Sequence, residues 1–224
     1  MSLKWAINGV LDDIYFYAQG IPRLFIAWKP DNKLSILDFF ETNVKKYPNE
    51  VAFIFNDKKI TWKEADDKIS SYGAYLQQQG IKPGDCFALL MDNCPDFLML
   101  LLAAHRIGAI AALINTTVTG EGLKHVVTIV DAKAIILGAS HLEKFNSSMP
   151  ESELKSLNTY LVEDSFEIPS GFVDINEASK DSKDVEPHKL KIKDVAMYIY
   201  TSGTTGLPKA ALITNGRAVK TSYA

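Results

Sequence analysis

The fold of this chain is decided by the stretch Met197-Tyr-Ile-Tyr-Thr-Ser-Gly-Thr-Thr-Gly-Leu-Pro-Lys-Ala210. Its first four residues are apolar or aromatic, which predicts a buried strand. The nine residues that follow, 201–209, combine hydroxyls, glycines, one proline and a final lysine, which predicts a loop that binds a polyphosphate. Gly203 and Gly206 allow positive φ and close approach of backbone N–H groups to anionic oxygens, and Lys209 adds a mobile cation.

The predicted phosphate-binding positions are continuous in the sequence: Tyr200, Thr201, Ser202, Gly203, Thr204, Thr205, Gly206, Leu207, Pro208 and Lys209. Two other phosphate motifs do not fit. Pro208 and Ala210 stand where a Walker A loop needs glycine and a magnesium-binding hydroxyl. Gly203 and Gly206 also lack the spacing of a dinucleotide fingerprint. An ordinary turn needs only one or two special residues, whereas nine consecutive positions here suit one ligand.

The segment Tyr200-Thr-Ser-Gly-Thr-Thr-Gly-Leu-Pro-Lys209 resembles the phosphate-loop signature of adenylate-forming (AMP-binding) enzymes, which include acyl-CoA synthetases, luciferases and adenylation domains of peptide synthetases. Three further segments resemble the branch of fatty-acid transport proteins and very-long-chain acyl-CoA synthetases. They are Ala210-Ala211, Ala111-Ala-Leu-Ile-Asn-Thr-Thr117 and Leu123-Lys-His125. The resemblance covers residues 34–224.

This resemblance implies an ATP-dependent acid-thiol ligase. Such an enzyme joins a fatty acid to AMP, releases pyrophosphate and then transfers the acyl group to CoA, with Mg²⁺ beside the phosphates. The family's adenine-binding, ribose-binding and catalytic residues are expected after Ala224. We therefore expect this chain to be an N-terminal part that is inactive alone. Two alternatives stay open: a non-catalytic fragment that acts by docking, and a ligase for another acid, of the carnitine type or an aryl acid.

Composition limits the other function classes. The chain has 224 residues, of which 47% are hydrophobic and 23% charged, with a net charge of −3. Such a chain buries a sizeable core, and a mildly acidic balance argues against a nucleic-acid partner. Cys86 and Cys94 show no metal or disulfide spacing, and the four histidines are scattered, so the sequence predicts free thiols and no metal centre.

The N-terminal residues 1–33 form a separate segment in this interpretation. Apolar residues recur at helical spacing before Gly20, and Leu24–Trp28 follow between Arg23 and Lys29. This pattern suits a helix in a membrane interface, and a helix packed on the rest of the protein suits it equally. No run reaches the roughly 18 to 20 apolar residues that a spanning helix needs. Residues 1–30 suit peripheral contact with a membrane, and the resemblance to fatty-acid transport proteins implies a membrane-associated protein at the cytosolic face of the endoplasmic reticulum, peroxisome or lipid droplet.

Residues 34–224 read as one partial domain of alternating helices and strands. Helices are predicted from Ser35 to Pro48, after the cap at Thr61, from Pro95 to Gly108 and over 120–130. A hairpin is predicted over 51–62, and strands over 86–91, 109–114, 134–137, 157–162 and 197–200. This alternation predicts an α/β fold with a mostly parallel, doubly wound sheet and helices on both faces. Residues 198–201 are expected to be a central strand, and residues 165–193 to be mainly surface.

Overall fold

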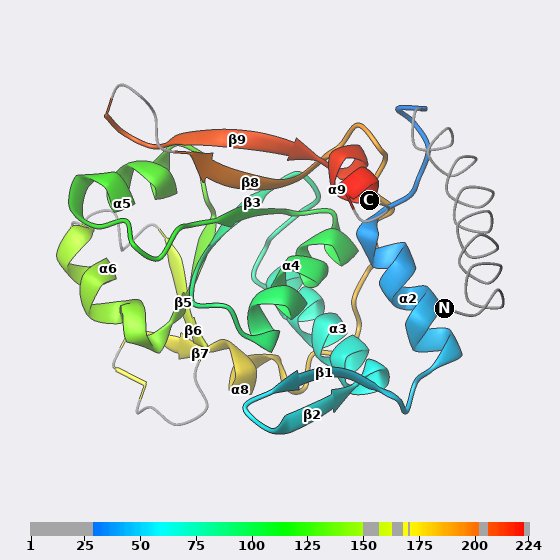
Figure 1. Cartoon of the computed structure of the whole chain (residues 1–224). Coiled ribbons are helices and arrows are strands. Elements are labelled where there is room, and N and C mark those ends of the chain that lie inside the picture. Colours follow the sequence, from blue (N-terminus) through cyan, green and yellow to red (C-terminus); the bar gives the residue numbers. More distant parts are fainter. Residues whose placement is uncertain (1–28, 150–156, 163–167, 170, 202–205, 222–224) are drawn as a thin grey trace, which may run out of the picture.

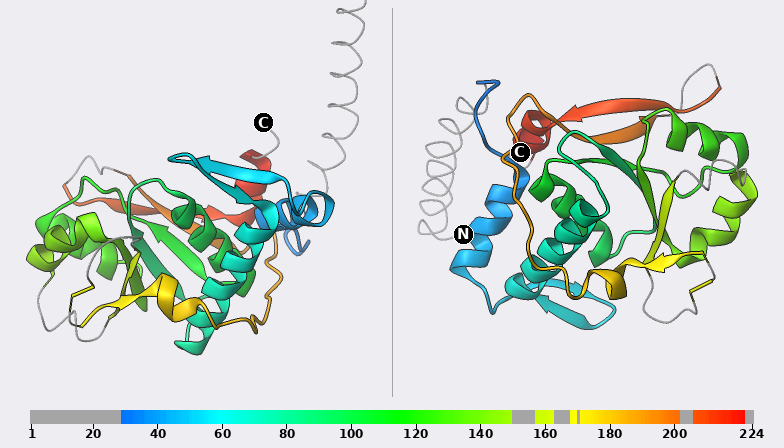
Figure 2. Two further views of the ribbon diagram at one scale, coloured as in Figure 1. Left: turned by 90° about the horizontal axis from the view of Figure 1, so that it is seen from below. Right: turned by 180° about the vertical axis from the view of Figure 1, so that it is seen from behind.

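The computed structural model describes residues 29–149, 157–162, 168–169, 171–201 and 206–221. These residues build a three-layer α/β unit in which a seven-stranded sheet lies between two groups of helices (Figures 1 and 2). A separate antiparallel hairpin, formed by β1 (Val51–Phe55) and β2 (Lys58–Thr61), lies beside one group. The predicted fold class is confirmed.

The sheet has the strand order β7-β6-β5-β3-β4-β8-β9, and every neighbouring pair is parallel except β8 with β9. The strands are β3 (Cys86–Leu90), β4 (Ile110–Leu113), β5 (Ala134–Gly138), β6 (Asn158–Val162), β7 (Val173–Asp174), β8 (Val195–Thr201) and β9 (Lys209–Thr214). β3 lies in the middle and is buried along its whole length. An unbroken apolar run is what such a doubly covered strand requires.

The four helices that the sequence predicts are present, together with further helices that it does not predict. They are α2 (Ile36–Lys46), α3 (Trp62–Gln78), α4 (Pro95–Ile107), α5 (Gly120–Thr128), α6 (Leu142–Ser148), α8 (Ile175–Ser179) and α9 (Asn215–Thr221), with a short 3₁₀ turn at Ala139–His141. At the start of α3, the Thr61 side chain accepts a hydrogen bond from the Glu64 N–H, and the Glu64 carboxylate accepts one from the Thr61 N–H at 2.8 Å. This is the predicted capping box. No helix among the described residues is long and apolar enough to cross a membrane.

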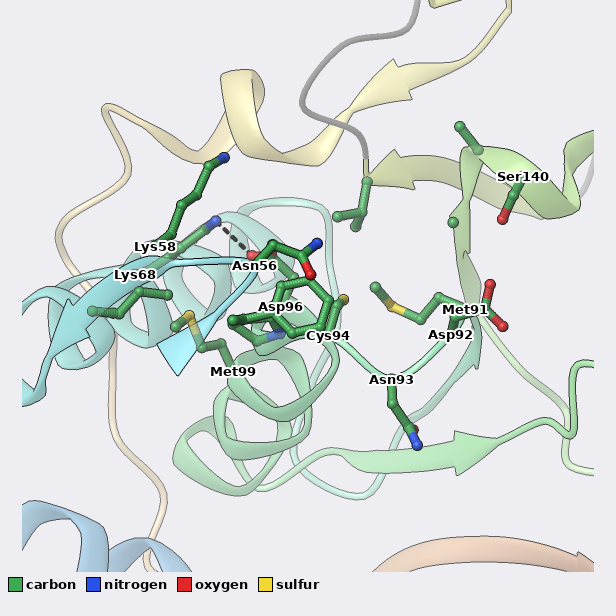
Figure 3. A pocket seen from close by; sticks show the side chains of 16 residues that line it. Asn56, Lys58, Lys68, Met91, Asp92, Asn93, Cys94, Asp96, Met99 and Ser140 are labelled. Atoms are coloured by element: carbon green, nitrogen blue, oxygen red, sulfur yellow. Dashed lines mark ion pairs between the residues drawn. The ribbon is translucent and has the colours of Figure 1, made fainter. Parts of the chain in front are cut away.

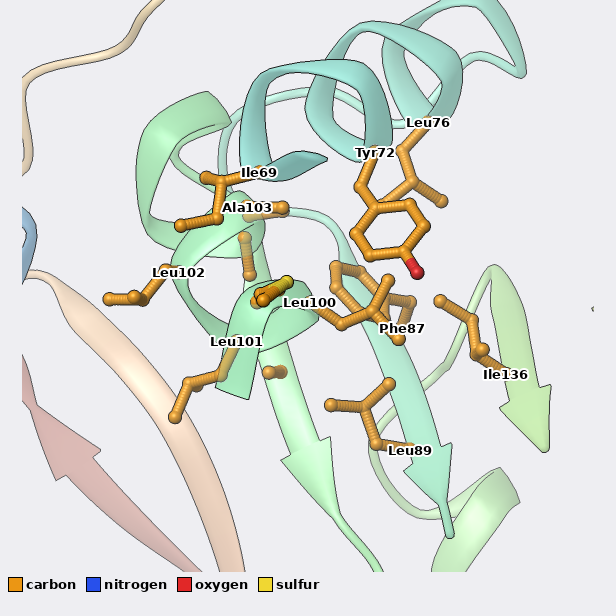
Figure 4. Packing of buried hydrophobic residues seen from close by; sticks show 14 of the residues in the cluster. Ile69, Tyr72, Leu76, Phe87, Leu89, Leu100, Leu101, Leu102, Ala103 and Ile136 are labelled. Carbon is orange, nitrogen blue, oxygen red and sulfur yellow. The ribbon is translucent and has the colours of Figure 1, made fainter. Parts of the chain in front are cut away.

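The two faces of the sheet carry two separate apolar clusters. On one face, Phe87 and Leu89 of β3 pack with Ile136 of β5 against α3 and α4, where Tyr72 and Leu100 are fully buried (Figure 4). On the other face, alternate strand residues pack against Leu123, Val126 and Val127 of α5 and Phe145 of α6. Each fully buried large side chain stabilises the fold by about 1.5 to 3 kcal/mol relative to exposure.

Two expectations from the sequence are wrong in detail. β8 is not a central strand, because only β9 lies beyond it, and Ile199 is 42% exposed. Residues 165–193 are not merely surface, because they add the edge strand β7 and the helix α8, whose Ile175 is fully buried against the core. Within this range, the charge-rich residues 180–186 are mostly exposed, although Ser182 is buried and donates to Gln78.

Candidate functional site

The predicted phosphate loop connects β8 to β9 at the carboxyl edge of the parallel strands. Tyr200 and Thr201 end β8, whereas Ser202, Gly203, Thr204 and Thr205 lie outside the described residues. On the return side, Thr201 pairs with Lys209 and Tyr200 pairs with Ala210. This antiparallel pairing closes the base of the loop and places Thr201 opposite Lys209, the last predicted binding residue.

The exit of the loop has the backbone that the sequence predicts. Gly206 has φ of 119°, and a Cβ added to it would have no neighbouring atom within 4 Å. Leu207 is 50% exposed, and Lys209 is exposed. A glycine at positive φ with open space around it lets a ligand approach the backbone, and an exposed lysine supplies the positive charge that an anion needs.

Helix α5 holds both sides of this loop. The His125 Nε2 atom lies 3.1 Å from the Pro208 carbonyl oxygen, and the Tyr200 hydroxyl donates to the Val126 carbonyl oxygen. Burial raises the pKa of Tyr200, so this hydroxyl stays protonated at neutral pH and remains a donor. Because α5 is itself packed on the sheet through Leu123 and Val126, it is a firm support for the loop.

A cavity of about 520 Å³ lies on the same edge of the sheet, at the carboxyl ends of β3 and β5 (Figure 3). The strand order reverses here, since β4 continues on one side of β3 and β5 lies on the other, and such a reversal is where open α/β sheets bind ligands. Met91 and Met99 give the cavity apolar surface. At its rim Lys68 forms an ion pair with Asp96 at 2.5 Å.

The cavity also borders two groups that could be taken for reactive ones. Cys94 is half-buried, and burial is the main cause that raises the pKa of its thiol, so the thiol is not activated. Asp92 lies beside His141, whose Nε2 is 3.1 Å from the Asp92 carboxylate. The cavity lining comes from several separate segments, so the sequence alone did not reveal it.

No metal centre is formed by the described part of the chain. No group of three or more His, Cys, Asp or Glu residues there gathers in a way that could hold an ion. The described groups at the loop are instead a backbone open to a ligand at Gly206 and the Lys209 cation, which fit phosphate oxygens. A magnesium ion at such a loop would be held largely by the phosphates of a nucleotide.

Solved structures share this fold. The crystal structure of the anthranilate CoA ligase AuaEII in complex with anthranoyl-AMP superposes with a TM-score of 0.75 at 21% identity, over 82% of this chain and 35% of that one. A structure described as a putative long-chain-fatty-acid CoA ligase from Rhodopseudomonas palustris gives a TM-score of 0.72 at 19% identity, over 82% of this chain and 45% of that one. At these identities the likeness shows the fold alone: the α/β architecture of the N-terminal part of adenylate-forming enzymes.

The sequence shows the family. Residues 40–224 match the AMP-binding enzyme family, and the chain belongs to that family. It is 30% identical over 217 residues to the medium/long-chain-fatty-acid–CoA ligase FadD6 of Mycobacterium tuberculosis, covering 97% of this chain and 35% of the relative. It is 29% identical to the human long-chain fatty acid transport protein 6, over 94% of this chain and 35% of that protein. The chain therefore spans about a third of the length of these relatives. The resemblance inferred from residues 200–209 is confirmed.

Of the ten predicted binding residues, the structure brings Tyr200, Thr201 and residues 206–209 together at one sheet edge. Sequence reasoning missed the roles of His125 and Val126 as supports of the loop. The only signal was the segment Leu123-Lys-His125, which marks the family branch but does not reveal its contact with Pro208.

Proposed function

We propose that this chain is the N-terminal portion of an ATP-dependent fatty-acyl-CoA synthetase of the long-chain or very-long-chain type. The observation that carries the proposal is the loop exit, with Gly206 at positive φ in open space and exposed Lys209 at the carboxyl edge of the sheet. The names of relatives that match nearly the whole chain, a fatty-acid–CoA ligase and fatty acid transport proteins, support the substrate class.

The proposed reaction has two steps. A fatty-acid carboxylate oxygen attacks the α-phosphorus of ATP, a new P–O bond forms, and pyrophosphate leaves with the electrons of the broken bond. The thiol of CoA then attacks the acyl carbon of the acyl-adenylate, AMP leaves, and the thiol proton is released. Within this chain, the hydroxyls of Ser202, Thr204 and Thr205, the loop N–H groups and Lys209 would hold the β- and γ-phosphates. Their contribution is electrostatic stabilisation of the leaving pyrophosphate. Mg²⁺ would add charge neutralisation at the same oxygens.

Lys209 acts more strongly in the transition state than on bound ATP. Negative charge grows on the pyrophosphate oxygens as the bond to the α-phosphorus breaks, so a nearby cation stabilises that state preferentially. In the intact enzyme, Lys209→Ala should therefore lower kcat for adenylation by about one to three orders of magnitude. The KM for fatty acid should change little, because the acyl chain binds elsewhere.

The test is fatty-acid-dependent exchange between ATP and labelled pyrophosphate, measured in the intact enzyme for wild type and Lys209→Ala. Lys45→Ala is the matched control, because Lys45 is an exposed lysine on α2, away from the loop. Unchanged kcat in Lys209→Ala would contradict the role of this lysine. The 224-residue chain alone should show no robust exchange with oleate, and exchange by this chain would show that its own residues suffice for adenylation.

A second acid class has an observation in its favour, since a solved structure with the same fold is an anthranilate CoA ligase. A panel of fatty, aryl and carnitine-type acids in the exchange assay separates the substrate classes. Absence of exchange with every acid in the intact protein would favour a docking role without catalysis.

The domain division and location are part of the same proposal. Residues 34–224 would form the first part of the adenylate-forming domain, and residues 1–33 a segment that lies on a membrane surface at the endoplasmic reticulum, peroxisome or lipid droplet. Residues 1–28 of that segment lie outside the described residues. Flotation with vesicles, with and without residues 1–30, tests this part independently of catalysis.

A further inference from the structure

His125 contacts the peptide unit that joins Pro208 to Lys209. Its Nε2 atom lies 3.1 Å from the Pro208 carbonyl oxygen, and Lys209, the next residue, is the first residue of β9. A carbonyl oxygen only accepts hydrogen bonds, so the Nε2 atom must carry the proton and donate it. The structure thus assigns the tautomer of this histidine: the Nε2–H form when the ring is neutral.

The contact constrains the direction of the Lys209 side chain. A peptide unit is planar, so fixing the Pro208 carbonyl oxygen also fixes the plane that contains the Lys209 nitrogen and Cα. On the other side, Lys209 is opposite Thr201 in the ladder between β8 and β9. The backbone of Lys209 is therefore held by α5 on one side and by β8 on the other, while the residue itself is exposed.

The entrance of the loop is held by the residue next to His125. The Tyr200 hydroxyl donates to the carbonyl oxygen of Val126, and Val126 is fully buried in the cluster below α5. Two consecutive residues of one packed helix thus contact the two ends of the loop. His125 is only half-buried, and its ring contacts the loop exit. We therefore expect its hydrogen bond to position the loop rather than to stabilise the apolar core.

We propose that His125 is a positioning residue for the phosphate loop: it sets the position of Lys209 through the Pro208 carbonyl without touching the substrate. This inference rests on the proposed function, because the oriented lysine matters only if the loop binds phosphate. Misplacing a reacting or stabilising group by about 1 Å can cost about 100-fold in rate, so loss of this contact should be measurable.

Three variants test the proposal. His125→Phe keeps a flat ring but removes the donor, and His125→Gln restores an N–H donor on an amide. His188→Phe is the matched control, because His188 is exposed and packs beside Gly108, at the end of the sheet opposite the loop. Thermal unfolding of each variant checks that it is folded. If His125→Phe does not fold, His125→Asn replaces it as the donor-free variant, because the shorter asparagine amide does not reach the Pro208 carbonyl.

The first readout uses the intact enzyme in the pyrophosphate-exchange assay. The donor-free variant should lose about 10- to 100-fold in kcat with the KM for fatty acid unchanged, while His125→Gln recovers most of the rate and His188→Phe keeps all of it. Wild-type kcat in the donor-free variant, or a Gln variant no better than it, would overturn the proposal.

The second readout uses the 224-residue chain and separates failure of this inference from failure of the proposed function. Nitrogen-15 NMR should show a proton on His125 Nε2, and titration with magnesium pyrophosphate should shift the Gly206 and Lys209 amides. In His125→Phe the Lys209 amide should move before any ligand is added, and pyrophosphate should bind about 10-fold more weakly. An unprotonated Nε2, or an unmoved Lys209 amide, would refute the positioning role even if no acid proves to be a substrate.

Discussion

Gly108 and His188 are in contact across the amino edge of the sheet: a Cβ atom added to Gly108 would lie 2.5 Å from Cδ2 of the His188 ring and 2.9 Å from its Cβ. Gly108 ends α4 in the left-handed conformation, with φ of 74°. The His188 backbone N–H donates to the Arg106 carbonyl oxygen at 2.7 Å, so the histidine cannot simply move away. Two constraints, one conformational and one steric, therefore require glycine at this position.

The first prediction separates these two constraints. Gly80 also has positive φ, 90°, but has no atom within 4 Å of an added Cβ. Gly80→Ala should therefore cost only the left-handed strain, about 1 to 2 kcal/mol. Gly108→Ala should cost about 1 to 3 kcal/mol more than Gly80→Ala, because the methyl group overlaps His188. Urea unfolding measures both values. Adding His188→Ala should recover only the part of the steric cost that comes from the ring, because alanine keeps the Cβ atom at 2.9 Å. Equal costs at the two glycines would contradict the clash.

The second prediction concerns the buried Arg106, which joins three helices. Its guanidinium donates to Asp66 at 2.6 Å and to Ser70 at 2.5 Å on α3, and it lies 3.6 Å from Glu41 on α2. Arg106→Met should lower the free energy of unfolding by about 2 to 3 kcal/mol, because hydrogen bonds to a charged group are lost.

The matched control is Lys63→Met, which removes an exposed pair with Asp67 at 2.8 Å. Its cost should stay below about 1 kcal/mol, as for most surface ion pairs. Equal effects of the two substitutions in denaturant titration would show that Arg106 contributes no more than a surface charge.

The third prediction is a dependence of stability on pH. His105 of α4 is 1% exposed, burial lowers its pKa to about 4, and within the described residues neither ring nitrogen has a hydrogen-bond partner. In the unfolded chain the pKa is about 6.5. The unfolded state therefore takes up a proton first, and stability falls as the pH decreases from about 6.5 to 4, by about 2 kcal/mol between pH 7 and pH 5.

His105→Phe should remove this part of the pH dependence, since the replacement ring does not titrate. Denaturant unfolding of wild type and variant at pH 7 and pH 5 provides the comparison, and the other titrating groups cancel between them. If both proteins lose the same stability over this range, His105 does not titrate as described.

The fourth prediction concerns Gly206 in the intact enzyme. Gly206→Val should lower kcat more than Lys209→Ala does, because a β-branched residue is strained at φ of 119° and occupies space that a phosphate needs. Gly84→Val is the control: Gly84 has φ of 88° and similarly open surroundings, but it lies before β3, at the opposite end of that strand from the loop edge. That variant should lose stability and keep kcat. Wild-type kcat in Gly206→Val would show that Gly206 is not part of the phosphate-binding site.

Local chemistry explains which parts of the fold were predictable. The Thr61–Glu64 box, Pro95 at a helix start and the apolar run 86–91 each determine a structure within a few residues. β7 was not predictable, because a strand of two residues has no periodicity, and its pairing with Tyr160 and Leu161 arises only in the folded sheet. The position of β8 near the edge depends on strand order, which periodicity does not encode.

The candidate site divides in the same way. A phosphate loop could be predicted over residues 200–209 because consecutive residues there offer the donors that phosphate needs, and this assignment stays a prediction. The His125 contact with Pro208 and the cavity at β3 and β5 join segments that are distant in the sequence. Only the tertiary structure brings such groups together.

The position of β8 also determines when the loop can form during folding. Met197 of β8 lies opposite Ala111 of β4, so this pairing closes a long stretch of chain that itself contains β5 and β6. Contacts of such high contact order are slow, since the loss of chain entropy precedes the gain in contacts. We therefore expect the β3–β4–β5 centre to assemble first and β8 to dock later. A newly synthesised chain would then acquire the loop between β8 and β9 at a late stage, and the pyrophosphate binding proposed for this loop would follow the final kinetic phase of refolding.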